Sequence, residues 1–143
     1  MSVTIQTYEE HYFANVDRLW RVVFPEDPPW NLAQVAIPAK LAVQPELFLL
    51  AVDNSDVVGT VMGGYDGHRG WVYALAVEPD HRQQGIATRL MDELEARLLA
   101  LGCHKLNLQV RAQNTEVLEL YQRLGYEVED RVSLGKRLVR PSA

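Results

Sequence analysis

The hydrophobic pattern of this chain changes period at Pro79, and that change sets most of what the chain can fold into. Before Pro79, apolar runs at residues 47–52, 57–65 and 71–77 are separated by short connections of aspartate, asparagine, serine and glycine, which is typical of an antiparallel meander. After Pro79, apolar residues recur at helical spacing up to Gly102, a typical helix stop. The sequence therefore predicts a meander of strands that leads directly into a long helix.

Shorter elements are expected on either side of this central region. In chain order they are a strand at residues 3–7, a helix at 9–24, a short helix around 38–43, a strand at 105–110, a helix at 115–124, and closing strands at 126–131 and 133–139. We expect a single domain over residues 1–143 with a mixed α/β layer architecture, in which the sheet lies between helices.

Composition excludes several classes of protein. The chain has a net charge of −5 and no basic run, which argues against binding nucleic acid. No apolar stretch approaches the roughly 18 residues that span a bilayer, and the N-terminus lacks a leader pattern, so we expect a cytoplasmic protein without a membrane partner. The lone Cys103 and four scattered histidines give no metal-ligand spacing, and no metal is predicted.

The turn between the third strand of the meander and the long helix is the first candidate site. It runs from Leu75 through Pro79 to Ala87 and carries Arg82 and Gly85. Backbone N–H groups at a helix N-terminus have no intrahelical acceptors and form an anion site, and small residues there let a phosphate approach the backbone. A P-loop or a dinucleotide fingerprint fits worse. The alternative is a simple helix-start glycine beside a surface arginine.

Two further features lie around this turn. If residues 75–77 are where the strand separates from its next neighbour, their free backbone groups can pair with an extended ligand arm, whereas the alternative is that they are only core. Asn114 is suited to cap the helix that follows it, and Tyr121 lies two turns along the same helical face. Tyr121 is equally compatible with a core position.

Taken together, these stretches resemble the GNAT acetyltransferases. Arg82, Gly85 and Ala87 match the family pattern of Arg or Gln, two residues, Gly, one residue, and Gly or Ala. Residues 114–126 match its later signature of Asn, Leu-Tyr and Leu-Gly-Tyr, roughly thirty residues downstream. Residues 59–70 and 133–138 look like the small bacterial YpeA-type group within that superfamily. The resemblance implies a largely antiparallel central sheet with a parallel, splayed strand pair and helices on both faces.

The resemblance also implies roles for individual residues. Backbone amides of the turn would bind the pyrophosphate of acetyl-CoA, Val77 would pair with pantetheine, the Leu75 amide would face the thioester carbonyl, and Tyr121 would protonate the departing thiolate. The cofactor-binding residues implied in this way are Leu75, Ala76, Val77, Arg82, Gln83, Gln84, Gly85, Ile86, Ala87, Thr88, Asn114, Leu118 and Tyr121.

The acceptor side departs from the family pattern. Gln109 occupies the position where the ribosomal-protein acetyltransferases of the superfamily carry a glutamate base, and an amide cannot accept the proton. Tyr73, or Glu46 through water, is an alternative base. By family analogy the acceptor cleft lies between the loop that carries Trp30 and the turn at residues 66–69, and Trp30 and Tyr73 are the expected substrate-binding residues.

Three functions are compatible with these features. The first is an N-acetyltransferase that moves an acetyl group from acetyl-CoA to a primary amine of a small molecule or peptide, by direct attack in a ternary complex. A homodimer is compatible with this function. The second is a non-catalytic acyl-CoA-binding or sensing module, which Gln109 favours and Tyr121 disfavours. The third is a structural interaction domain, which leaves both motifs unexplained.

Overall fold

The computed structural model describes residues 2–139. The chain forms two compact units, Met1–Gln109 and Val110–Ala143. The family motifs therefore fall on both units, with the turn in the first and the Asn114–Tyr121 helix in the second. The expectation of a single domain over residues 1–143 stays a prediction.

The first unit is built on a five-stranded mixed sheet of order β1-β2-β3-β4-β5. The first four strands pair antiparallel in sequence order, and β4 pairs with β5 in parallel. The strands are β1 (Val3–Thr7), β2 (Phe48–Asp53), β3 (Asp56–Tyr65), β4 (Gly70–Val77) and β5 (Leu106–Asn107). The predicted meander and the predicted parallel pair are both confirmed, although the strand expected at 105–110 shrinks to two residues.

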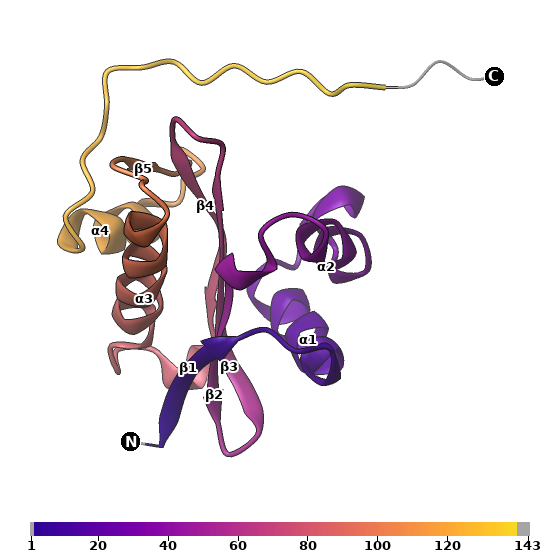
Figure 1. The fold of residues 1–143 in the computed structure, drawn as a ribbon. Coiled ribbons are helices and arrows are strands. Elements are labelled where there is room, and N and C mark those ends of the chain that lie inside the picture. The colour runs from indigo at the N-terminus through magenta and orange to yellow at the C-terminus, as the bar shows by residue number, and fades with distance from the viewer. Residues whose placement is uncertain (1, 140–143) are drawn as a thin grey trace. The chain divides into compact units, whose positions relative to one another are not determined.

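Helices cover both faces of this sheet, as the sequence predicts (Figure 1). They are α1 (Phe13–Val23), α2 (Ala33–Leu41) and α3 (Ile86–Ala100). The helix expected around 38–43 is α2, and it begins earlier because Pro38 lies inside the helix instead of near its start. Short 3-10 turns lie at Glu10–Tyr12, Pro29–Asn31, Pro45–Leu47 and Pro79–His81.

The core lies on both sides of the sheet. On one face, α1 and α2 pack against the strands in a cluster of Tyr8, Val16, Leu19, Trp20, Ala33, Ile37, Phe48, Leu50, Val52, Val57, Met62 and Ala76. On the other face α3 lies close to β3, where a Cβ on Gly63 would stand 2.5 Å from the Leu94 side chain. Glycine at this position therefore lets the long helix approach the sheet. That approach fixes where the N-terminus of α3 lies relative to β3 and β4.

The second unit contains α4 (Thr115–Arg123). The Asn114 side chain accepts a hydrogen bond from the Val117 N–H at 3.4 Å, and Gly125, at φ 98°, follows the helix end, so both predicted helix boundaries are confirmed.

The closing strands predicted at residues 126–131 and 133–139 are wrong: within residues 126–139 the structure has no strand. Their alternating apolar side chains are exposed, with Val132 at 86% and Leu134 at 91%. Alternation favours an extended backbone, but a strand also requires a partner, which the pattern of one segment does not supply.

Candidate active site

The N-cap residue of α3 supplies no side-chain acceptor for the first backbone amides of the helix. Gly85 is the N-cap, adopts φ 78°, and makes no capping hydrogen bond through a side chain, and the first helical turn contains no acidic residue. The N–H groups at this end therefore retain the positive end of the helix dipole without a local anion to neutralise it. Residues 82–85 are exposed. The turn is thus open to an anionic ligand from solvent.

The backbone conformation of Gly85 favours glycine, and the space beside it is open. Its positive φ is costly for residues with a side chain, which explains glycine on backbone grounds alone. Among the described residues, none comes within 4 Å of a Cβ placed at this position, so the space next to Gly85 is open. Gln83 also has positive φ, at 63°, which the sequence does not signal. The free space and the uncapped amides together fit a phosphate group.

Among the residues that the structure describes, none pairs as a strand with one edge of β4 beyond Trp71. The pairing with β5 involves only Gly70 and Trp71, so β4 separates from its neighbour beyond Trp71, as the sequence suggests for residues 75–77. The Glu78 N–H donates to Val58 in β3 at 2.8 Å. Because successive amides alternate in direction along a strand, the amides of Val77 and Leu75 point away from β3, toward the open edge. This edge fits an extended arm that carries amide groups.

Arg82 connects the turn to this edge. Its Nε donates to the Val77 carbonyl oxygen at 3.3 Å. Arg82 is therefore more than a surface charge, because it satisfies a main-chain acceptor on the side of β4 that lacks a strand partner.

A bulge at Ala74 interrupts β4 immediately before Leu75. The register of β3 with β4 shifts between Thr60 and Met62, and Ala74 adopts φ 52°, a left-handed conformation that is uncommon for alanine. The Thr60 hydroxyl donates to the Ala74 carbonyl at 2.9 Å. Sequence reasoning missed both residues. A threonine within an otherwise apolar strand is the one signal that pointed to them.

The second unit holds the other motif residues. Asn114 caps α4, Leu118 is half-buried, and Tyr121 is 7% exposed with its ring edge-on to Tyr126 at a centroid distance of 5.7 Å. Burial raises the pKa of Tyr121 to about 12, so the phenol is protonated at neutral pH. That these residues meet the β4 edge stays a prediction.

The residues expected on the acceptor side are exposed. Trp30 is 46% exposed and Tyr73 is 56% exposed. Burial and the charge of Asp66 raise the pKa of Tyr73, which disfavours the phenolate and makes this residue a poor base near neutral pH. Asp66 accepts hydrogen bonds from the backbone N–H groups of His68 and Arg69, so His68 is a hairpin-tip residue.

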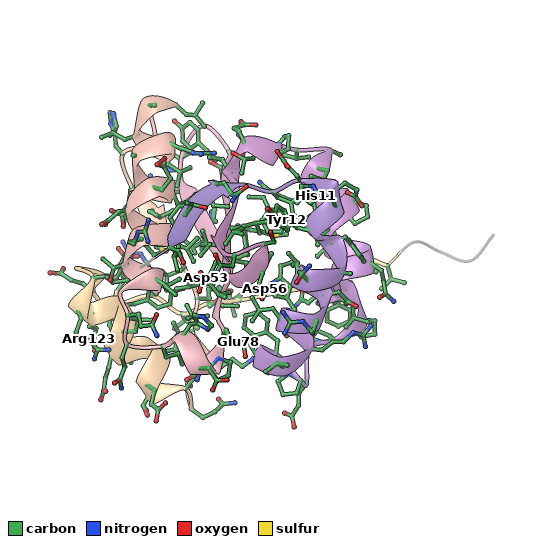
Figure 2. All side chains as sticks on the ribbon, turned by 90° about the horizontal axis from the view of Figure 1, so that it is seen from below. His11, Tyr12, Asp53, Asp56, Glu78 and Arg123 are labelled. Atoms are coloured by element: carbon green, nitrogen blue, oxygen red, sulfur yellow. The ribbon has the colours of Figure 1, made fainter. Side chains whose placement is uncertain are left out.

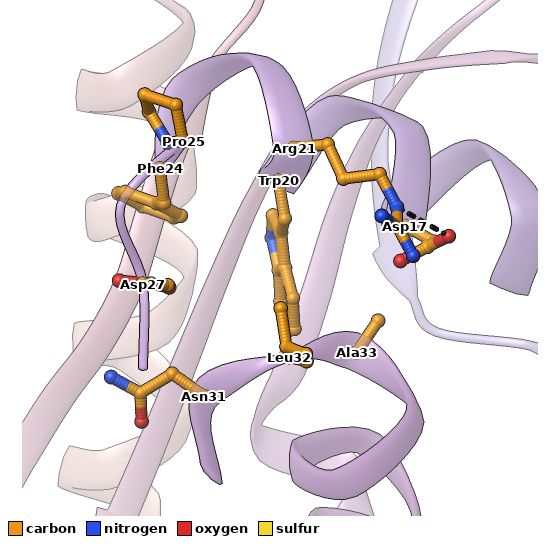
Figure 3. Close-up of a pocket in the computed structure, with 9 residues that line it drawn as sticks. All are labelled: Asp17, Trp20, Arg21, Phe24, Pro25, Asp27, Asn31, Leu32 and Ala33. Atoms are coloured by element: carbon orange, nitrogen blue, oxygen red, sulfur yellow. Dashed lines mark hydrogen bonds and ion pairs between the residues drawn. The ribbon is translucent and has the colours of Figure 1, made fainter. Parts of the chain in front are cut away.

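A cavity of about 200 Å³ lies between the end of α1 and the loop before α2 (Figure 3). It is lined by Asp17, Trp20, Arg21, Phe24, Pro25, Asp27, Asn31, Leu32 and Ala33. Asp17 and Arg21 form an ion pair at 3.1 Å, and the Trp20 ring forms part of the wall. Trp30 belongs to the same loop but does not line the cavity.

A second cavity, of about 350 Å³, carries several charges. Asp53, Asp56 and Glu78 (Figure 2) line it together with Arg18 and His81. The His81 Nε2 lies 3.5 Å from Asp53, and Arg18 lies 3.8 Å from Glu78. Across residues 2–139, no three histidine, cysteine or acidic side chains are grouped so that they could hold a metal ion. None of the helices described is long and apolar enough to cross a membrane.

The family match and similar relatives of this sequence indicate the same family. Residues 8–126 match the acetyltransferase (GNAT) family. An acetyltransferase of Yersinia pestis strain Pestoides F is 51% identical over 111 residues, which cover 78% of this chain and 79% of the relative. An acetyltransferase of Pectobacterium atrosepticum is 50% identical with the same coverage.

Solved structures share the fold at lower identity. Ard1 from Thermoplasma volcanium superposes with a TM-score of 0.82 at 21% identity, covering 90% of this chain and 85% of that protein. The PaiA N-acetyltransferase of Thermoplasma acidophilum, solved with coenzyme A, gives 0.80 at 19% identity, covering 92% and 94%. The family match, the half-identical relatives and the shared fold lead to one conclusion: the chain belongs to the GNAT family of acetyltransferases.

Proposed function

We propose that this acetyltransferase moves an acetyl group from acetyl-CoA to a primary amine by direct attack in a ternary complex. The observation that carries the proposal is the position of the uncapped α3 N-terminus next to the unpaired edge of β4. Pyrophosphate requires an anion site and pantetheine requires an extended partner for its amides, and the chain offers both within residues 72–88.

Main-chain groups do most of the binding. The first amides of α3, with Gln83, Gly85, Ala87 and Thr88, hold the pyrophosphate, and the Val77 amide pairs with the pantetheine arm. Acetyl-CoA supplies the activated acyl group and a thiolate leaving group. The Leu75 amide, directed to the open edge, donates to the thioester carbonyl oxygen and stabilises the negative charge that develops there during attack.

Proton transfer involves Tyr121 and solvent. The protonated phenol of Tyr121 donates a proton to the thiolate as it leaves, and its pKa of about 12 keeps that proton in place at neutral pH. Gln109 cannot act as a base, so the acceptor amine loses its proton to water before it attacks. No covalent intermediate with the chain is required, and Cys103 is a buried core residue with Sγ 3.3 Å from the Lys105 carbonyl.

The acceptor is a small-molecule or peptide amine. Structural neighbours include the aminoglycoside acetyltransferase AAC(6')-Iy with a bisubstrate analogue and the NatC complex bound to a peptide and CoA, with TM-scores of 0.77 and 0.72. Both kinds of acceptor therefore occur on this fold. The exposed Trp30 loop, outside both CoA motifs, is the proposed acceptor-reading segment.

The test of the CoA site compares two substitutions of equal size. Gly85→Asp places a negative charge above the α3 N-terminus, whereas Gly85→Asn has the same bulk and tolerates the left-handed conformation better than most residues. Calorimetry with CoA should show at least a tenfold weaker Kd for the aspartate variant than for the asparagine variant, because 1.4 kcal/mol of repulsion is a factor of ten in affinity. Equal affinities in two folded variants would remove the pyrophosphate from this turn.

A non-catalytic acyl-CoA-binding module is the second candidate, and Gln109 at the position of the usual base is the observation that favours it. Release of CoA from acetyl-CoA in the presence of varied amines separates the two functions. An acetyltransferase gives amine-dependent thiol release, whereas a binding module gives calorimetric CoA affinity with no release above the hydrolysis of free acetyl-CoA.

A further inference from the structure

We propose that Thr60 and Trp20 are positioning residues that aim the Leu75 amide at the thioester carbonyl, acting through a hydrogen-bonded chain that ends on the Ala74 carbonyl. This inference rests on the proposed function. It assigns a role in the reaction to two buried side chains in β3 and α1, neither of which belongs to the CoA motifs.

The chain of hydrogen bonds has only one possible direction. The Trp20 Nε1 donates to the Thr60 Oγ1 at 2.9 Å, and the Thr60 Oγ1 donates to the Ala74 carbonyl at 2.9 Å. An indole N–H is a donor only, so the hydroxyl must accept from it and has its single proton free for the carbonyl. The interaction is buried as well: Thr60 is fully buried and Trp20 is 5% exposed.

Burial makes this arrangement specific. Thr60 is the one polar residue that the described part of the fold buries, in a core of otherwise apolar side chains. A hydroxyl or carbonyl left without a partner in such a core costs about 1–3 kcal/mol. The two bonds therefore hold the Ala74 carbonyl oxygen in one orientation, toward Thr60.

The geometry of the peptide bond transmits this orientation to Leu75. The Ala74 carbonyl and the Leu75 N–H belong to the same peptide unit, and none of the described peptide bonds is cis. In a planar trans peptide the C=O and N–H point in opposite directions. Fixing the Ala74 oxygen toward β3 therefore fixes the Leu75 hydrogen toward the open edge of β4, where the proposed thioester carbonyl lies.

The strain at Ala74 explains why such a support is required. A left-handed conformation costs alanine about 1–2 kcal/mol, and the bulge has no ladder partner that would impose it. The hydroxyl bond to its carbonyl offsets that cost and also polarises the peptide unit, which makes the Leu75 N–H a stronger donor. Position and donor strength of this amide both depend on Thr60.

The experiment uses Thr60→Val, which keeps the side-chain shape but removes the hydroxyl. The readout is the ¹³C resonance of [1-¹³C]acetyl-CoA, because a hydrogen bond to the thioester carbonyl moves it downfield. We expect the wild-type chain to shift this resonance downfield on binding, and Thr60→Val to lose most of that shift while the Kd for CoA stays within about twofold. With n-butylamine as a minimal primary amine, kcat should fall about tenfold or more.

Two further variants separate positioning from general stability. Thr60→Ser restores the hydroxyl and should restore the shift. Leu98→Ala removes methyl groups from a buried position of α3, outside the cluster that packs against Ala74, and should lower the free energy of unfolding with the ¹³C shift unchanged.

The outcomes also distinguish this inference from the proposed function. A wild-type chain that does not bind acetyl-CoA contradicts the proposed function. A wild-type chain that gives the downfield shift, with a folded Thr60→Val variant that gives the same shift, overturns the positioning role and leaves the function in place. If Thr60→Val does not fold, Thr60→Ala decides, because it also removes the hydroxyl, and an unchanged shift in that variant overturns the inference. Trp20→Phe tests the role of Trp20 alone: an unchanged shift there limits the positioning role to Thr60.

Discussion

Tyr121 is the residue to which the proposed reaction assigns the role of general acid. Its side chain is almost fully buried, and burial raises its pKa to about 12. An ordinary thiol has a pKa of about 8.5, below that of this phenol, so the proposed transfer requires that burial at the site raises the pKa of the departing thiol as well.

We therefore predict that Tyr121→Phe lowers kcat by about 10² to 10⁴, the usual contribution of a positioned acid, while the Kd for CoA stays near that of the wild type. Steady-state kinetics with n-butylamine measure kcat, and calorimetry with CoA measures the Kd. Tyr126→Phe serves as the control, since it keeps the aromatic packing against Tyr121 and should keep the rate. Turnover of Tyr121→Phe at the native rate, with chemistry shown to be rate-limiting, would assign the proton to solvent.

At single positions, the sequence predicts a local conformation where the residue type itself favours that conformation. Asn114 as a helix cap and Gly85 at a left-handed helix start are both recognisable, because amide caps and glycines are enriched there for local reasons. Ala74 is not recognisable, since nothing local to alanine favours φ 52°. Its conformation depends on Thr60, fourteen residues earlier, and only the folded sheet brings the two together.

At the scale of elements, β3 extends beyond its partner and a side chain takes the partner's place. The last pair of β2 with β3 is Phe48 with Met62, yet β3 continues to Tyr65. Gln44 completes the pairing: its amide nitrogen donates to the Tyr65 carbonyl and its oxygen accepts from the Tyr65 N–H, both at 2.9 Å. The Gln44 side chain thus makes the two hydrogen bonds that a residue of a neighbouring strand would make.

Removing the two Gln44 hydrogen bonds should destabilise the sheet. Gln44→Ala leaves a donor and an acceptor of β3 without their partners in a half-buried position, and we predict a loss of about 1–3 kcal/mol in the free energy of unfolding. Urea denaturation followed by circular dichroism measures it. Gln34→Ala, on the exposed side of α2, should change stability by less than about 0.5 kcal/mol. Equal effects would mean that solvent replaces the Gln44 bonds at no cost.

The spacing of apolar residues predicts the order and type of most helices and strands. It fails for the closing strands. Residues 47–77 and 86–101 fold as their patterns predict because each pattern matches a face that the sheet or helix buries. Residues 126–139 carry an equally regular alternation but form no strand in the structure. Strand pairing depends on a second segment, so the pattern of one segment predicts conformation better than it predicts pairing.

For the whole molecule, buried tyrosines link stability to alkaline pH. Tyr8 stacks on Phe48 at a centroid distance of 4.6 Å, and burial, followed by the charge and hydrogen bond of Glu10, raises its pKa to about 12. In the unfolded chain tyrosine ionises near pH 10. The folded state therefore keeps a proton that the unfolded state loses between about pH 10 and pH 12, so stability is complete below pH 10 and falls as the pH rises through this interval.

We predict that the urea midpoint of unfolding decreases from pH 9.5 to pH 11.5 and that Tyr8→Phe flattens this decrease. Each unit of pKa difference corresponds to about 1.4 kcal/mol, which makes the effect measurable in a small protein. Comparison of the wild type with Tyr8→Phe at pH 8, where the tyrosine is not ionised, corrects for the loss of stability caused by removing the hydroxyl itself. A parallel decrease in both would assign the alkaline loss to other groups.

The bond from Arg82 to the Val77 carbonyl has a consequence for the energetics of ligand capture. A ligand arm that lies along β4 does not find a vacant acceptor at this position, because the guanidinium already occupies it. Pairing with that carbonyl is an exchange in which one donor replaces another, and such exchanges change the net free energy little. In the proposed complex the selectivity of the edge would then reside in the amides of Leu75 and Val77, and the guanidinium that leaves the Val77 carbonyl would be able to contact the phosphates of the cofactor.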